Sequence, residues 1–144
     1  MSRKIAKDPA EKLLKAYYNI LSGSIIYESA LIKVGTRIPQ GQTKYILLYI
    51  EDISPMNTGD KIIYNATVTL ECVSMQGTTE GDSSIVNSLS EQVMELVGDP
   101  DMFIMTGFKV CTSIFDGSEP SSELTDTNFI TSRKIRMSNI IEQS

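Results

Sequence analysis

The chain contains no histidine and only two cysteines among its 144 residues. Without histidine, the Ser-His and Cys-His pairs of nucleophilic enzymes cannot form, and nearly all catalytic zinc sites are excluded. Acid–base chemistry would have to use carboxylates, lysine or tyrosine. The two cysteines, Cys72 and Cys111, are far apart in the sequence. In a cytosolic chain we expect them to be free buried thiols and not a disulfide.

Long apolar runs are also missing. The first ten residues carry charges and a proline but no apolar stretch, so no secretory signal is predicted. No segment approaches the ~20 apolar residues that a membrane helix needs. Hydrophobic residues make up 41% of the chain and charged residues 22%, as in ordinary globular domains. We therefore expect one soluble domain over 1–144, with a flexible N-terminus at 1–7 and no membrane partner.

The net charge of −5 is unevenly distributed along the chain. Residues 80–126 hold ten acids against one base, Lys109, whereas the remainder holds eight acids against twelve bases. An acidic middle argues against a protein that wraps nucleic acid. Regions of opposite sign suit head-to-tail self-association, although a solvated surface would explain them equally simply.

Two segments have the apolar spacing of amphipathic helices. The first is 8–22, with Asp8 as its N-cap, Pro9 at its first position and Gly23 as its stop. The second is 83–97, capped by Asp82 or Ser83. Helical spacing also predicts that the neighbouring tyrosines of the first helix, Tyr17 and Tyr18, belong to the core and do not form a stacking platform.

Strands are predicted between and after these helices, at 25–27, 45–51, 62–73, 102–115 and 129–141. In the fourth of them Phe108, Val110 and Ile114 are expected on one face. Consecutive strands that are joined by loops pair antiparallel. The predicted fold class is therefore α+β, an antiparallel sheet of four to five strands with two helices packed on one face.

Polar loops are expected at 35–44, 54–60, 74–82 and 116–128, the last of them long and acidic. A basic cluster follows, in which Lys134 and Arg136 share one strand face while Arg133 points to the other. We expect this cluster to pair with the acidic loop, within the chain or from a neighbour. The candidate oligomer or docking residues are Arg37, Lys44, Asp116, Glu119, Glu123, Asp126, Lys134 and Arg136.

Catalytic, cofactor and metal motifs are not found. The glycines of 77–81 precede a helix but lack the lysine and spacing of a phosphate-binding loop. Turn chemistry explains the acid pairs Glu51-Asp52 and Asp99/Asp101 better than a metal or an acid–base pair does. The sequence therefore predicts a protein that is not an enzyme and holds no cofactor or metal.

The order of elements resembles the tail-terminator family of long-tailed phages, over roughly residues 10–141. The resemblance is carried by a helix AEKLLKAYYNILSG, a stretch GTRIPQGQTKYILLYI, a strand IIYNATVTLECVS, a helix SSIVNSLSEQVMELVG and two closing strands. It implies a ring of subunits, commonly six, that caps the tail tube and joins it to the neck. DNA would pass through a central channel without specific binding.

The resemblance also implies where the protein acts and what it meets. Its partners would be further copies of itself, the tail tube protein, and a head-completion or other neck protein. It would assemble in the host cytoplasm and reside in the virion. Two alternatives remain open from the residues alone: a small peptide- or ligand-binding module that uses a sheet edge, and a carboxylate-based enzyme without histidine.

Overall fold

A computed structural model describes residues 5–56, 59–77 and 81–144. Its helices are α1 (Ala10–Leu21), α2 (Ser84–Val97) and the short 3-10 helix η1 (Pro100–Met102). Its strands are β1 (Ile26–Tyr27), β2 (Ala30–Leu31), β3 (Lys33–Gly35), β4 (Lys44–Pro55), β5 (Ile63–Gly77), β6 (Phe108–Leu124) and β7 (Asn128–Gln143). The predicted flexible N-terminus lies mostly outside the described residues. Within them, Ile5 and Lys7 hydrogen-bond to the side chain of Gln143.

The main sheet has five strands in the order β3-β4-β5-β7-β6, and β1 pairs only with β2 in a separate small hairpin. All pairs in the main sheet are antiparallel except β3–β4, which is parallel. The prediction of a wholly antiparallel sheet was therefore wrong at one edge. The loop 36–43 returns the chain past the three residues of β3 before β4 begins, so both strands run in the same direction. Eight residues can extend ~26 Å, well over the ~10 Å that this return requires.

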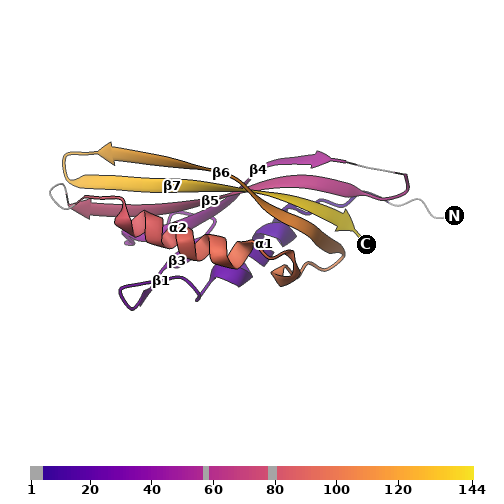
Figure 1. The fold of residues 1–144 in the computed structure, drawn as a ribbon, viewed down its shortest axis with the longest axis horizontal. Coiled ribbons are helices and arrows are strands. Elements are labelled where there is room, and N and C mark those ends of the chain that lie inside the picture. The colour runs from indigo at the N-terminus through magenta and orange to yellow at the C-terminus, as the bar shows by residue number, and fades with distance from the viewer. Residues whose placement is uncertain (1–4, 57–58, 78–80) are drawn as a thin grey trace.

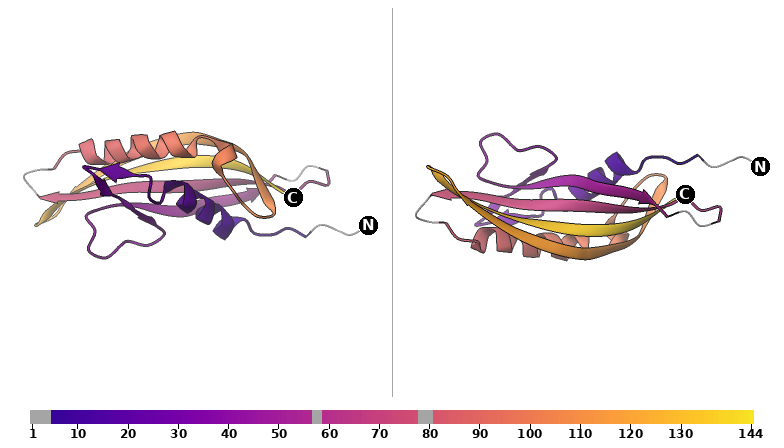
Figure 2. Two further views of the ribbon diagram at one scale, coloured as in Figure 1. Left: turned by 90° about the horizontal axis from the view of Figure 1, so that it is seen from below. Right: turned by 90° about the horizontal axis from the view of Figure 1, so that it is seen from above.

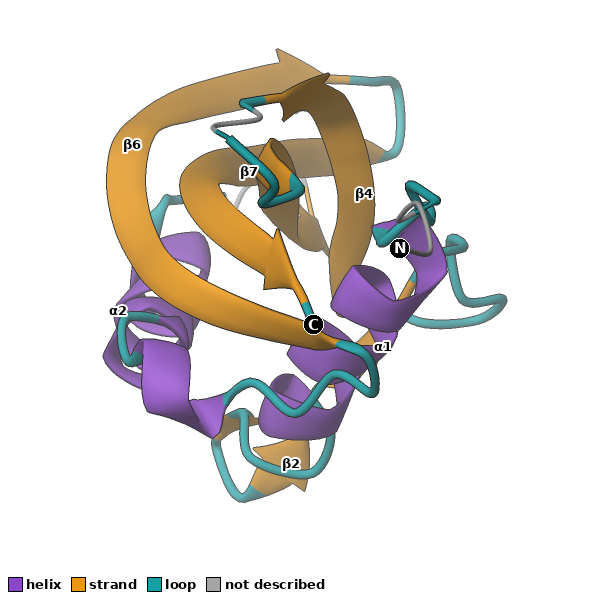
Figure 3. Ribbon diagram, turned by 90° about the vertical axis from the view of Figure 1, so that its right-hand side faces the viewer, coloured by secondary structure: helices purple, strands orange, loops and turns teal. Residues whose placement is uncertain are grey.

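Both helices cover the same face of the sheet, as predicted, and leave the other face bare (Figures 1 and 2). Viewed along the long axis, they lie together beneath a strongly twisted sheet (Figure 3). The core between the two layers contains Leu13 and Leu21 of α1, Leu89 and Val93 of α2, and alternate residues of β5 and β7. Burial of such aliphatic side chains, at ~1.5–3 kcal/mol each, drives the assembly of the layers.

The predicted cap is confirmed at α2, where Ser83 is the N-cap, but it is wrong by one residue at α1, where Pro9 and not Asp8 is the N-cap. At each start, the carboxylate just before the N-cap binds the first turn of the helix. The Asp8 carboxylate accepts a hydrogen bond from the Ala10 amide at 2.9 Å. At α2, the Asp82 carboxylate accepts from the Ser84 amide at 2.9 Å and from the Ser84 hydroxyl at 2.6 Å. These two bonds to Ser84 lower the pKa of Asp82, because they stabilise its ionised form.

The predicted loop 116–128 is wrong, because most of it is strand. β6 continues to Leu124 and β7 begins at Asn128, with a tight turn between them (Figure 1). In that turn the Thr125 amide donates to the Asn128 carbonyl, and the Asn128 amide donates back to the Thr125 hydroxyl. Likewise β5 extends to Gly77, through a segment predicted as loop. Backbone pairing with β7 holds both segments, although their side chains are polar.

Two irregularities in β6 change which side chains reach the core. The register with β7 shifts between Val110 and Thr112 and again between Phe115 and Gly117. Each extra residue turns the following side chains to the opposite face. Phe108 and Val110 are buried, but Ile114 is 57% exposed, so its predicted place on the same face as these two residues was wrong. The strand also begins later than predicted, after the 3-10 turn η1.

The cysteines are both free, which agrees with the prediction of no disulfide. Cys72 is buried, and this burial raises the pKa of its thiol to about 12. Cys111 is exposed, contrary to prediction, because it follows buried Val110 on β6 and alternation turns it away from the covered face.

A buried hydrogen-bond network joins α1 to the sheet. Tyr17 is fully buried, and its hydroxyl donates to the side-chain oxygen of Asn139 at 2.8 Å. The Asn139 amide donates in turn to the carbonyls of Ala66 and Met137, both at 3.2 Å. Its neighbour Tyr18 is 43% exposed, so only one of the two tyrosines belongs to the core as predicted.

Candidate functional site

The helix-free face of the sheet, opposite α1 and α2, carries four of the eight predicted interface residues. Lys134 lies directly across from Glu71 on β5 and from Glu119 on β6. The Ser138 hydroxyl donates to the Asp116 carboxylate at 3.3 Å, which places Asp116 over the same face. The right-hand view of Figure 2 shows that no helix covers this surface.

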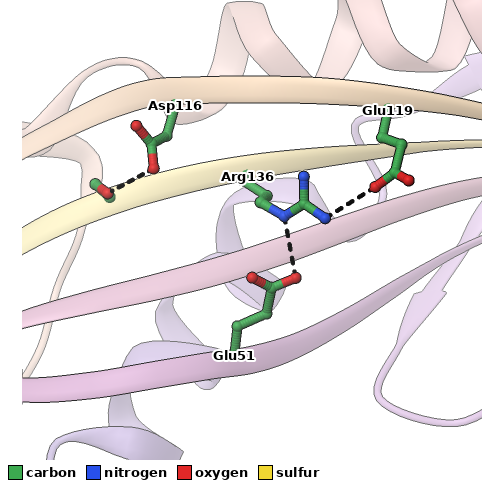
Figure 4. A network of polar contacts seen from close by, with 5 residues as sticks. Glu51, Asp116, Glu119 and Arg136 are labelled. Atoms are coloured by element: carbon green, nitrogen blue, oxygen red, sulfur yellow. Dashed lines mark hydrogen bonds and ion pairs between the residues drawn. The ribbon is translucent and has the colours of Figure 1, made fainter.

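Arg136 joins three strands of this face (Figure 4). Its Nε donates to Glu51 on β4 at 3.2 Å, and one terminal nitrogen donates to Glu119 on β6 at 2.9 Å. Hydrogen bonds to Glu119 and Glu51 raise the pKa of Arg136. The Thr69 hydroxyl and Arg136 together lower the pKa of Glu51. The predicted pairing of the basic cluster with residues of 116–126 is thus confirmed for Arg136 and Glu119, within one chain.

Glu123, Asp126, Arg37 and Lys44 lie elsewhere. Glu123 and Asp126 are exposed at the far end of the β6–β7 hairpin. Arg37 is exposed in the loop 36–43, and the Lys44 ammonium lies 5.9 Å from the centre of the Tyr27 ring. Because β3 and β6 form opposite edges of the main sheet, a single chain does not bring these bases and acids together.

A groove of about 600 Å³ between α1 and β3 was not identified from the sequence. It is lined by Leu14 and Tyr18, by the open backbone of Gly35, and by charged residues of α1: Glu11, Lys12 and Lys15. The Lys12 ammonium donates to the Thr106 carbonyl at 2.8 Å, whereas Lys15 is exposed. A Cβ atom on Gly35 would meet nothing within 4 Å, so the space above it is empty of protein.

A second cleft lies under the hairpin, next to the start of α2, with Ser83, Phe129 and Arg133 among its walls. As predicted, Arg133 faces away from Lys134 and Arg136. Its Nε donates to the Ser118 hydroxyl at 2.6 Å, and a terminal nitrogen donates to the Asn87 side chain at 3.1 Å. These bonds fasten the hairpin to α2.

The outer edge of β6 is poorly suited to adding another strand. Pro120 has no backbone N–H to donate, and the two irregularities interrupt the regular row of backbone groups. Acidic side chains such as Glu119 and Glu123 further discourage pairing. Contacts made along this edge would therefore involve side chains more than backbone.

The described ranges contain neither a metal-binding cluster nor a membrane-spanning helix. No group of three or more cysteine, aspartate or glutamate side chains there is arranged to hold a metal ion. No helix in those ranges is long and apolar enough to cross a bilayer.

Comparisons with known proteins give a likeness of fold. No family model matches the sequence, and no curated protein is similar to it in sequence. Among solved structures, a chain of one described as "Virion of native gene transfer agent (GTA) particle" has the same fold. The TM-score is 0.63, with 11% identity over 92% of this chain and 90% of that chain. At this identity the likeness shows that the two chains share an architecture over nearly their full length.

Proposed function

We propose that this protein is a structural component of a phage-like virion. It forms a ring at the head–tail interface that caps or terminates the tail tube and joins it to the neck, with a central channel for DNA. The observation that carries the proposal is the shared fold with a chain of a virion particle, over nearly the full length of both chains. The order of helices and strands that resembles the tail-terminator family agrees with it.

The charge distribution supports a ring with a DNA channel. On the helix-free face, the cations Lys134 and Arg136 are surrounded by Glu51, Glu71 and Glu119. The charge of Arg136 is therefore already paired, and Lys134 has an acid opposite it on each neighbouring strand. Such a surface would let DNA slide past, because retention of phosphates requires uncompensated bases. In the proposed ring, this helix-free face lines the channel.

We also propose that the chain performs no catalysis and needs no cofactor. The two groups whose pKa is raised to about 12 are Tyr17 and Cys72, and both are buried in the core. Neither lines the groove beside α1 or the cleft under the hairpin. Perturbed groups that are inaccessible to a substrate are typical of structural burial and not of an active site.

Electron microscopy of the purified protein at high concentration, together with its mass in solution, tests the proposal. We expect closed rings with a central hole, most often of six subunits, and binding of those rings to the ends of tail tubes. A protein that remains monomeric at all concentrations and does not bind tail tubes would contradict the proposal. That result would favour the peptide-binding alternative, whose sheet edge would be β4 beyond Leu47, because β3 pairs only with residues 45–47.

A further inference from the structure

The tip of the β6–β7 hairpin, residues 123–126, protrudes with an unusual combination of side chains. Leu124 is 67% exposed, so its aliphatic side chain is available for contact with another surface. Glu123 and Asp126 flank it, and both are exposed. The tip thus presents one apolar side chain between two negative charges. It is supported by β7, which pairs with β5 along nearly its full length.

The groove between α1 and β3 has the complementary character. Leu14 and Tyr18 offer apolar surface, and the space above Gly35 is open to an incoming side chain. Lys12 and Lys15 stand along its side, against the single acid Glu11. Arg37 adds a further positive charge in the loop that follows β3. An acidic tip with one leucine therefore matches a basic-sided apolar groove in both charge and polarity.

Tip and groove are far apart within one chain. The tip stands at one end of the long axis, whereas α1 lies beneath the other half of the sheet (Figure 1). We propose that the hairpin tip of one copy docks into the α1–β3 groove of the next copy. This contact uses different surfaces on its two sides, and repeated around an axis such contacts close into a ring. The inference rests on the proposed ring and names the contact that builds it.

A charge exchange tests the pairing. Lys15→Glu and Glu123→Lys should each weaken subunit association by about fivefold, because each replaces attraction by repulsion at an exposed contact. The double variant should recover most of the association. Glu91→Lys, on the exposed side of α2, makes the same charge change away from both surfaces and should behave as wild type. Sedimentation measures association, and circular dichroism checks that each variant is folded.

Cross-linking tests the orientation directly. One chain carries Gly35→Cys and a second carries Leu124→Cys, both with Cys111→Ser to remove the exposed native thiol. Gly35 tolerates a side chain because its space is open and its backbone is not left-handed. Oxidation of a mixture should give a covalent dimer that contains one chain of each kind. Either chain alone should give none.

The outcomes separate this inference from the proposed ring. Mixed cross-links together with rescue by the double variant support the docking contact. Rings that assemble without mixed cross-links, and are indifferent to Lys15→Glu and Glu123→Lys, overturn the docking contact and leave the proposed ring intact. A wild-type protein that does not assemble, together with a mixture of cysteine variants that does not cross-link, overturns both. Mixed cross-links without closed rings support the contact but contradict the ring.

Discussion

Removal of one buried hydroxyl should reveal how α1 is held on the sheet. In Tyr17→Phe, the side-chain oxygen of Asn139 loses the hydrogen bond that it now accepts at 2.8 Å. Both residues are fully buried, so water does not readily replace the lost donor. A buried polar atom without its partner costs ~1–3 kcal/mol. We therefore expect Tyr17→Phe to lower the free energy of unfolding by that amount at pH 7.

The same substitution should have a different effect at alkaline pH. Burial raises the pKa of Tyr17 to about 12, because the phenolate would be poorly solvated. The folded state therefore holds this proton more tightly than the unfolded state, whose tyrosine pKa is ~10. The stability that this provides is complete below pH ~10 and is lost as the pH rises towards ~12. A shift of ~2 units corresponds to ~2.7 kcal/mol over that window.

Phenylalanine has no proton to lose, so the stability gap between wild type and Tyr17→Phe should narrow between pH 10 and pH 12. Urea unfolding of both proteins at pH 7 and across that window measures the gap. The thiol of Cys72 also titrates in this range, but both proteins contain it, so its contribution cancels in the difference. A gap that stays constant with pH would refute the reasoning about Tyr17.

Three further experiments test other parts of the fold. Leu89→Asp should unfold the domain, because it places a charge in the fully buried stripe of α2; circular dichroism would show it. Ile114→Thr should change stability by less than ~0.5 kcal/mol, whereas Val110→Thr should cost ~1 kcal/mol or more, and equal effects in urea would disprove the change of face in β6. Reducing agent should leave the melting temperature unchanged, because Cys72 and Cys111 are free; a drop of several degrees would contradict this.

The helices were predictable because their information is local. A stripe of apolar residues every three or four positions marked both of them, and Asp8 and Asp82 marked their starts. The alternation in β5 and β7 likewise identified the faces that are buried. In each case one face of the element packs against the apolar core along most of its length. The apolar residues therefore recur with the period of the helix or strand.

The distal hairpin was not predictable by the same means. Residues 117–124 have no covered apolar face, because α2 begins beneath the hairpin and leaves a cleft there. Without burial, no alternation is required, and serines, acids and Pro120 are tolerated. Pairing with β7 is a non-local interaction that local composition does not reveal. The two irregularities of β6 were not predictable either, because the extra residues, Cys111 and Asp116, are not glycines.

Of the predicted interface residues on the helix-free face, Arg136, Glu119 and Asp116 already have partners within the chain. Lys134 lies between Glu71 and Glu119, and Arg136 bonds to Glu51 and Glu119. A neighbour gains little from approaching charges that are compensated. The sequence identified charged residues correctly but could not separate these from the others, because compensation depends on which strands become adjacent.

Charges available for assembly are found at the hairpin tip and beside α1. Among the described residues, Glu123, Asp126 and Lys15 take part in no ion pair or side-chain hydrogen bond. Two of them are at the hairpin tip, and the third is at the groove beside α1. Complementary charges steer encounter and specify partners, whereas like charges brought together repel. The separation of free acids from free bases thus favours contact between successive copies, and disfavours tip against tip or groove against groove.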